Sequence, residues 1–404
     1  MRKKLILMFL AGIIVLSACG TFEVRIEQFP TPTIDAGAVA TIVAATLAAY
    51  PTPTVTTPPV TLPILPNSLY YWKSLDSQTN LGQIFRLERN SLANTQVTNE
   101  PEGVSSQYDV SSLTGQLAYN TGKQFVLIDA DGRNRRVVSQ SASSANALAW
   151  PHWSPDGHTL AYANNGIYFY SADTPVSKLV MANDTTRTYS PRGFSPDGSR
   201  LLVSMYDQHR NTLGIYNLAS KVLMFLQPSE TLDLDQCCGP VAWSGDAGQL
   251  YISERGAASG CSACTMPGLW RYDAGGNGAA LLPGLDNSGT IIQNKTAAPW
   301  LDTFGNLMFL FSPPGSGANA PYSLFRSNPD AVTNRAALRP EKFYVVNALW
   351  APTGDALLIV QSDGSAANNK PANLILVPVD PSRPVVTLLP DASRIDENSL
   401  RWGP

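Results

Sequence analysis

The segment HWSPDGH, residues 152–158, holds a serine, an aspartate and two of the chain's three histidines. A hydroxyl, an imidazole and a carboxylate within hydrogen-bonding reach are the nucleophile, base and orienting group of many hydrolases. A catalytic aspartate does not need to recur, but Asp156 does, because FSPDG follows at residues 194–198 with Asp197 in the same place. The repetition favours a structural turn, and we expect no catalytic residue in this segment.

Six segments share one pattern, an apolar residue followed by a leucine seven positions later. The apolar residues are Val110, Trp153, Phe194, Trp243, Trp300 and Trp350, and the leucines are Leu117, Leu160, Leu201, Leu250, Leu307 and Leu357. Successive starts lie 41 to 57 residues apart, with short apolar or alternating strands between them, as at 160–164, 166–172 and 177–181. A period of about 40 to 50 residues with several strands per unit is the signature of propeller blades.

The two ends of this region complete each other. Residues 68–74, 82–89 and 94–99 have the pattern of three strands with no repeat start before them, whereas residues 400–402 look like a start with nothing after it. Pairing between them would close the ring and remove exposed strand edges. The sequence therefore predicts an all-β, seven-bladed propeller of four-stranded blades over residues 68–404. Six blades is the alternative, if one of the weaker units is an insertion.

Each residue type in the repeated motif suits a turn between two strands. Pro155 fixes φ, Asp156 accepts hydrogen bonds from nearby amides, and Gly157 takes the positive φ that ends a hairpin loop. Trp153 supplies a large apolar area for packing between neighbouring blades. The residues to which we assign such structural roles are Trp153, Asp156, Gly157, Phe194, Asp197, Gly198, Trp243, Asp246, Trp300, Trp350 and Trp402.

These repeats resemble the WD40-like (PD40) β-propeller repeat of the TolB-like family, which is found in the periplasmic protein TolB and in the propeller domains of prolyl-oligopeptidase-type peptidases. The resemblance rests on WSPDG at 153–157 and FSPDG at 194–198, with weaker copies elsewhere, and it covers about residues 68–404. It implies the propeller fold and, by likeness to TolB, protein partners. Propellers host many unrelated activities, so the repeat alone does not specify a function.

The chain begins with the pattern of a secretory signal peptide over residues 1–18. Three basic residues precede an apolar run at 5–16, which is shorter than the roughly 20 residues of a spanning helix. LSAC at 16–19 resembles the lipobox of bacterial lipoproteins, which implies a lipid on Cys19. We therefore expect a mature protein outside the cytoplasm, anchored to the membrane through this lipid, in a leaflet that depends on the envelope type. An ordinary cleavable signal peptide is the alternative.

Residues 19–67 form a predicted tether of distinct composition. Proline and threonine dominate residues 29–33 and 51–66, which favours an extended, semi-stiff stalk. Residues 35–50 predict a short helix whose apolar side chains fall near one face. Such a helix either associates with a partner or remains a spacer that is helical only part of the time, and the sequence leaves both open.

Four further cysteines gather around a single unit of the repeat, at Cys237, Cys238, Cys261 and Cys264. In an exported protein, an even number of clustered cysteines predicts disulfides. Each member of the adjacent pair would bond to one of the later two, in an order that the sequence leaves open. A four-thiolate zinc site is the competing interpretation, although the adjacent pair lacks the C-x2-C spacing of such sites.

Charge and motif content exclude several classes of function. The formal net charge is −3, and a surface of this kind does not attract phosphate backbones, so we expect no nucleic-acid partner. The sequence contains no G-x-S-x-G nucleophile elbow, phosphate loop, EF-hand loop or zincin motif. We expect no cofactor, no metal ligands and no enzymatic activity.

Two functions from different classes remain. The favoured one is a membrane-anchored binding or scaffold module that engages another envelope protein, a peptide or a cell-wall glycan. The longest loops, at 257–267, 312–321 and 364–371, are the candidate contact surface. The alternative is a polysaccharide lyase or glycosidase, which would require paired carboxylates or a set of His, Tyr and Arg side chains that converge in the central funnel.

Overall fold

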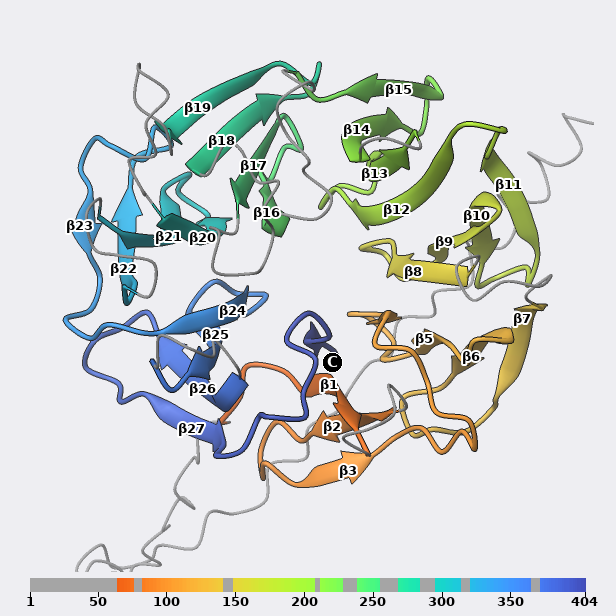
Figure 1. The fold of residues 1–404 in the computed structure, drawn as a ribbon, viewed down its shortest axis with the longest axis horizontal. Helices are drawn as coiled ribbons and strands as arrows, with labels where there is room; N and C mark the ends of the chain where they lie inside the picture. Colours follow the sequence, from red (N-terminus) through yellow and green to blue (C-terminus); the bar gives the residue numbers. More distant parts are fainter. Residues whose placement is uncertain are drawn as a thin grey trace, which may run out of the picture. The chain divides into compact units, whose positions relative to one another are not determined.

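The computed structural model describes residues 64–75, 82–140, 148–207, 211–227, 238–254, 268–283, 295–313, 320–364 and 371–404. These residues form seven four-stranded antiparallel sheets, which stand as blades around one axis (Figure 1). The predicted seven-bladed propeller is therefore confirmed, and the six-bladed alternative is wrong. The predicted signal peptide, Cys19 and the predicted helix lie outside the described residues. No helix in the described part of the chain is long and apolar enough to cross a membrane.

The strands follow one another blade by blade, from the axis outward. The closing blade contains β28 (Arg401–Trp402), β1 (Leu69–Ser74), β2 (Gly82–Leu87) and β3 (Asn94–Gln96). Blade 2 contains β4 (Tyr108–Val110), β5 (Leu117–Asn120), β6 (Gln124–Ile128) and β7 (Arg136–Gln140). Blade 3 contains β8 (Leu148–Trp153), β9 (Thr159–Asn164), β10 (Gly166–Ser171) and β11 (Ser177–Ala182).

The remaining blades have the same order. Blade 4 contains β12 (Thr188–Phe194), β13 (Arg200–Tyr206), β14 (Asn211–Asn217) and β15 (Val222–Phe225). Blade 5 contains β16 (Cys238–Trp243), β17 (Gln249–Glu254), β18 (Gly268–Asp273) and β19 (Gly278–Pro283). Blade 6 contains β20 (Lys295–Leu301), β21 (Leu307–Ser312), β22 (Ser323–Ser327) and β23 (Ala336–Ala337). Blade 7 contains β24 (Val345–Trp350), β25 (Ala356–Ser362), β26 (Pro371–Pro378) and β27 (Val386–Leu389).

The repeated leucines lie at the start of the second strand in blades 2 to 7. All six are fully buried, at 0% exposure, and lie in clusters between neighbouring blades. The apolar residue seven positions earlier ends the innermost strand in five of these blades. In blade 6 the turn is one residue shorter, so Leu301 instead of Trp300 pairs opposite Leu307. Trp300 consequently lies against Trp350 of the next blade, with ring centroids 6.1 Å apart.

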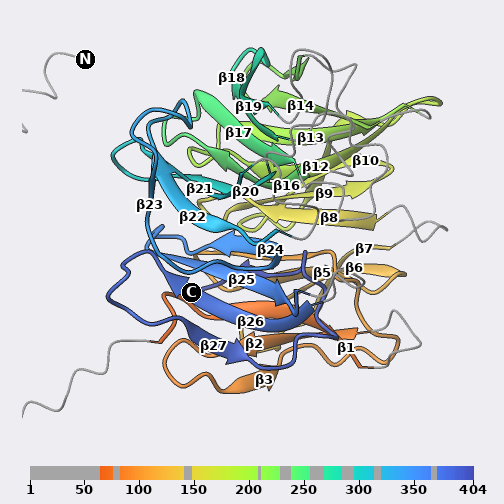
Figure 2. The same ribbon diagram turned by 60° about the vertical axis from the view of Figure 1, so that its left-hand side comes forward.

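The ring closes through the last residues of the chain. Arg401 and Trp402 pair with Tyr70 and Leu69, as the terminal segments predict. In Figures 1 and 2 the orange closing blade lies beside dark-blue blade 7, and the two share one apolar cluster. The indole Nε1 of Trp402 donates to the Trp350 carbonyl at 2.7 Å. Closure therefore combines strand pairing with a hydrogen bond between blades.

The two ends of the ring differ in their connections. At one end of the ring, the first strand of each of blades 2 to 7 connects to the second, and the third connects to the fourth. We call this end the turn face and the opposite end the loop face. The chain enters at the turn face, where Leu65, in the segment assigned to the tether, is fully buried and donates its amide to Arg89 O at 3.1 Å. The chain also ends there, where Gly403 N donates to Ser68 O at 2.9 Å.

Replacing Trp402→Phe tests the closure. The variant keeps an aromatic ring but removes the hydrogen bond to the Trp350 carbonyl, so we expect the free energy of unfolding to fall by about 1 to 3 kcal/mol. Trp153→Phe is the matched control, because the buried Nε1 of Trp153 has no hydrogen-bond partner among the described residues. Urea unfolding measures both, and equal losses would show that the hydrogen bond contributes nothing to closure.

Candidate functional site

The SPDG turns lie on the turn face and bond internally. Ser154 Oγ donates to Asp156 Oδ1 at 2.5 Å, and the same carboxylate oxygen accepts from His158 N at 3.1 Å. The pairs Ser195 with Asp197 and Ser244 with Asp246 repeat this geometry at 2.6 and 2.5 Å. The structure thus places all three aspartates in turns, with their carboxylates engaged by the turn itself.

The glycine of the turn has two physical reasons to be glycine. Gly157 has φ +69°, which a side chain rarely adopts, and a Cβ there would lie 3.1 Å from Ser111 Oγ and 3.3 Å from Leu113 Cβ. Ser111 and Leu113 belong to the corresponding turn of the preceding blade. The turn of blade 3 therefore packs against the turn of blade 2, which gives this part of the turn face a structural role.

A pocket of about 470 Å³ lies on the loop face, between connections of the closing blade and blade 2. One wall is the link between β3 and β4, another is the β5–β6 hairpin, and the third is formed by β1 and the segment before β28. The lining residues are Trp72, Glu102, Gly103, Val104, Ser105, Ser106, Thr121, Gly122 and Asp396. The lining contains two carboxylates and no basic side chain, so the pocket suits a cationic group.

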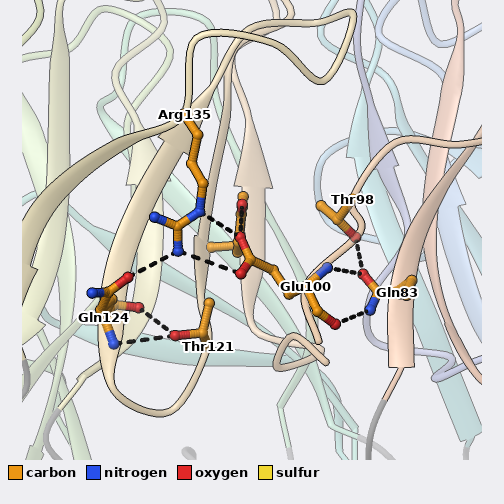
Figure 3. A network of polar contacts seen from close by, with 7 residues as sticks. Gln83, Thr98, Glu100, Thr121, Gln124 and Arg135 are labelled. Carbon is orange, nitrogen blue, oxygen red and sulfur yellow. Dashed lines mark hydrogen bonds and ion pairs between the residues drawn. The ribbon is translucent and has the colours of Figure 1, made fainter. Parts of the chain in front are cut away.

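A polar network holds the wall that carries Glu102 (Figure 3). The Glu100 carboxylate accepts from Tyr119 OH at 2.7 Å and from Arg135 Nε at 2.7 Å, and Arg135 Nη2 also donates to Gln124 Oε1 at 2.8 Å. Burial opposes ionisation of Glu100, but the hydrogen bonds from Arg135 and Tyr119 outweigh it and lower the pKa of the carboxyl. Glu100 is therefore ionised at neutral pH and anchors the link.

The backbone of the same link is fixed from the other side. Gln83 Nε2 donates to the Glu100 carbonyl at 2.7 Å, and Gln83 Oε1 accepts from Thr98 Oγ1 at 2.7 Å (Figure 3). The amides of Gly103 and Val104 donate to Glu100 O and Gly82 O at 2.9 and 2.8 Å. The pocket wall is thus preorganised by hydrogen bonds to strands β2 and β5 and to Arg135, the residue before β7.

The two carboxylates of the pocket differ in their partners. Glu102 Oε1 pairs with Lys123 Nζ at 2.7 Å, but both side chains are more than half exposed, at 62% and 73%, so solvent screens this pair. Asp396 Oδ1 accepts from Asn398 N at 2.8 Å. The indole Nε1 of Trp72 donates to the Val104 carbonyl at 2.8 Å, so its ring is held as part of the floor.

The innermost strands carry a second group of polar side chains. Arg401 Nε lies 3.3 Å from Asp109 Oδ1, and Asp109 Oδ2 accepts from Trp153 N at 2.7 Å. His152 is the residue before Trp153, and Arg192 lies on β12 of the next blade. Asp109 is the only Asp or Glu within these seven strands. The innermost strands therefore lack the carboxylate pair of a glycosidase.

The polar side chains of the innermost strands do not provide an acid and a base whose pKa values lie near neutral pH. Burial, followed by the charges of Arg401 and Arg192, lowers the pKa of His152 to about 3. Burial raises the pKa of the neighbouring Tyr108 hydroxyl well above its ordinary value. A catalytic acid or base works best with a pKa near the working pH. This geometry consequently favours neither the lyase nor the glycosidase alternative.

The other predicted positions have different outcomes. Cys237, Cys261 and Cys264 lie outside the described residues, and Cys238 begins β16, so neither disulfides nor a zinc site is tested. The loops at 257–267, 312–321 and 364–371 connect second to third strands of blades 5, 6 and 7. Their described ends lie on the loop face, the same face as the pocket. Their other residues lie outside the described part of the chain.

Sequence reasoning missed the pocket. Glu102 and Asp396 lie in irregular connections that belong to no repeat, and no motif surrounds them. Trp72 lies within the strand predicted at 68–74, and the neighbouring sequence does not indicate that its side chain lines a cavity. The sequence offered one general indication, which is that these residues lie in connections between strands. Binding residues are often found in such connections.

No known family model and no curated protein matches the chain. Among solved structures, it is similar to the oligogalacturonate lyase of Vibrio parahaemolyticus, with a TM-score of 0.51 at 10% identity over 81% of this chain and 89% of the lyase. It is similar to prolyl endopeptidase, with a TM-score of 0.51 at 12% identity over 82% of this chain and 49% of the peptidase. The chain thus spans about half of that peptidase.

TolB from Acinetobacter baumannii aligns with a TM-score of 0.42 at 15% identity, over 80% of this chain and 79% of TolB. The predicted resemblance to prolyl-oligopeptidase-type propellers holds at the level of the fold, on the alignment with prolyl endopeptidase. The prolyl endopeptidase and the lyase catalyse different reactions on similar propellers, so the fold does not select among activities.

The variant Asp197→Asn tests whether the turn carboxylate stabilises the fold, because this contribution should depend on pH. Burial opposes ionisation of Asp197, but the hydrogen bonds from Ser195 and Ser199 prevail and lower the carboxyl pKa to about 2. Since the unfolded chain has a pKa near 3.9, this carboxylate stabilises the fold fully above about pH 4 and loses its effect as pH falls through 2. We expect the variant to be less stable by up to about 1 kcal/mol at pH 6, with the difference vanishing near pH 2.

Chemical unfolding at each pH measures this difference. Asp131→Asn, at an exposed aspartate outside the SPDG turns, is the control and should show a smaller change. A constant difference between wild type and Asp197→Asn from pH 6 to pH 2 would contradict the role assigned to the carboxylate.

Glu100→Gln tests the wall of the pocket. The variant replaces a charged acceptor by a neutral one, and a hydrogen bond to a charged group contributes about 1.5 to 3 kcal/mol. We expect amide hydrogen exchange at Gly103 and Val104 to accelerate by about tenfold or more. Glu88→Gln, which breaks the pair with Arg86 at 2.5 Å on the turn face, is the matched control and should leave these amides unchanged.

Proposed function

We propose that this chain is a membrane-anchored, extracytoplasmic propeller that binds a protein or peptide partner of the cell envelope on its loop face. The pocket beside blade 2 is the observation that carries the proposal. It is acidic, preorganised and large enough for one long side chain, so we assign it to a lysine or arginine of the partner. The anchored, extracytoplasmic location rests on the predicted signal peptide over residues 1–18 and on the lipobox-like segment that ends at Cys19.

The course of the chain supports this use of the loop face. Leu65 enters the propeller at the turn face, and β1 runs from there to the loop face. The described chain therefore enters the propeller at the end of the ring opposite the pocket. We assign the partner to the loop face, which carries the pocket.

The chemistry of the pocket supports binding by charge. Asp396 and Glu102 come from different connections, so a cation between them would be contacted from two sides. The hydroxyls of Ser105, Ser106 and Thr121 add hydrogen-bond acceptors. A basic side chain satisfies such a lining better than a neutral sugar does, because the only aromatic ring, Trp72, is 8% exposed.

Site-specific photo-crosslinking in intact cells tests the proposal. A photoreactive amino acid at Ser106, in the pocket lining, should form an adduct with one discrete envelope protein. Adding Asp396→Asn should reduce the adduct at least severalfold, because Asn keeps the hydrogen bond to the Asn398 amide but removes the charge. The matched control position is Phe304, which is 88% exposed on the turn face and should give no such adduct.

The opposite pattern would reject the proposal. Adducts from Phe304 alone would move the binding surface to the turn face. Adducts from Ser106 that do not change with Asp396→Asn would keep the loop face but remove the pocket from recognition. The absence of any protein adduct at either position would contradict a protein partner.

A further inference from the structure

A basic side chain of the propeller itself reaches one carboxylate of the loop-face pocket. Lys123 follows Thr121 and Gly122, which line the pocket, and its Nζ lies 2.7 Å from Oε1 of Glu102. Glu102 is one of the two lining carboxylates that we assign to a basic side chain of the partner. An ammonium group of the chain therefore already occupies a position that the partner's cation would take.

The backbone that carries Lys123 is fixed by its own hairpin. Between β5 and β6, Thr121 N donates to Gln124 O at 3.0 Å, and Thr121 Oγ1 accepts from Gln124 N at 3.2 Å (Figure 3). Gly122 has φ +83°, and its amide donates to Asn120 Oδ1 at 2.7 Å. A positive φ at the first central residue of a two-residue turn favours glycine. The turn thus holds the Cα of Lys123 in one place beside the pocket.

Arg135 fixes this hairpin relative to the wall that carries Glu102. Its Nη2 donates to Gln124 Oε1 at 2.8 Å and to Glu100 Oε2 at 3.3 Å (Figure 3). Gln124 is the residue after Lys123, and Glu100 lies two positions before Glu102. One guanidinium therefore holds the backbone on both sides of the Lys123–Glu102 pair, and the two side chains of the pair are the parts that can move.

The pair itself is weak enough to exchange. Lys123 and Glu102 are exposed, at 73% and 62%, and such pairs contribute little because solvent screens them and long side chains lose rotamer freedom. Neither side chain has another hydrogen bond among the described residues. The flexible four-carbon stem of lysine allows Lys123 to release Glu102 while the hairpin stays in place.

We propose that Lys123 competes with the partner for Glu102. The inference rests on the proposed function, in which a lysine or arginine of the partner enters the pocket. In the free protein Lys123 pairs with Glu102. On binding, the partner's cation replaces Lys123 and contacts Glu102 and Asp396 together. The competition lowers the affinity for any single basic side chain, so Lys123 sets how strongly the pocket binds.

Binding of a defined peptide to the full chain tests the proposal. The probe is acetyl-Gly-Lys-Gly-amide, in which the lysine ammonium is the only charge, and the amide resonances of Gly103 and Gly122 report its binding in NMR titrations. We expect Lys123→Gln to bind the probe about two- to fivefold more tightly than wild type, because an exposed ion pair no longer has to be broken. Lys178→Gln, which removes an equal charge from an exposed position of β11, is the matched control and should leave the affinity unchanged.

The Glu102→Gln background separates competition from a general effect of charge. Without this carboxylate Lys123 has nothing to compete for, so adding Lys123→Gln to Glu102→Gln should leave the affinity nearly unchanged. A gain of equal size in both backgrounds would show that Lys123 acts only by repelling the probe, and it would overturn the proposal. A gain of equal size in Lys178→Gln would overturn it as well.

A neutral peptide distinguishes failure of this proposal from failure of the proposed function. Acetyl-Gly-Nle-Gly-amide carries norleucine in place of lysine and should bind neither protein. If wild type binds the lysine peptide and Lys123→Gln binds it no more tightly, the competition is wrong and the cationic pocket stands. If neither wild type nor Lys123→Gln prefers the lysine peptide to the norleucine peptide, the cationic pocket fails, and the competition fails with it.

Discussion

Closure of the ring removes the exposed edge that β1 would otherwise present, and closure here depends on a very short strand. Strand β28 has two residues, yet it fills the innermost position of the closing blade. Side-chain contacts connect this strand to neighbouring blades. Arg401 reaches Asp109 of blade 2, Asp109 reaches the Trp153 amide of blade 3, and Trp402 reaches the Trp350 carbonyl of blade 7. Four blades are thereby joined through residues at the end of the chain and one buried carboxylate.

The two faces of the ring differ in how their connections are stabilised. On the turn face, blades 3, 4 and 5 repeat one solution, in which a serine and an aspartate bond within the turn. On the loop face, the described link between β3 and β4 is fixed by its own network around Glu100. A regular face provides the frame, and an irregular face is free to carry recognition.

The fold could be predicted because its signals are local and repeated. The leucine seven positions after each start, such as Leu160, is buried in every copy, and residues 400–402 looked unfinished because their partner strand lies at the other end. The pocket could not be predicted, since Glu102 and Asp396 meet only in space. His152 was set aside because no other repeat carries a histidine there. Its surroundings come from β28 and β12, whose convergence only the closed ring creates.

The shared closing blade also sets the order in which the molecule can fold. Asn67 bonds to Gly403, 336 positions later, so the first strands to be synthesised wait for the last ones. Until then β1 presents an open edge, and contacts of such long sequence separation form slowly. Without Arg401 and Trp402, the inner edge of β1 would have no partner strand. These two residues therefore protect a backbone edge that could otherwise pair with another chain.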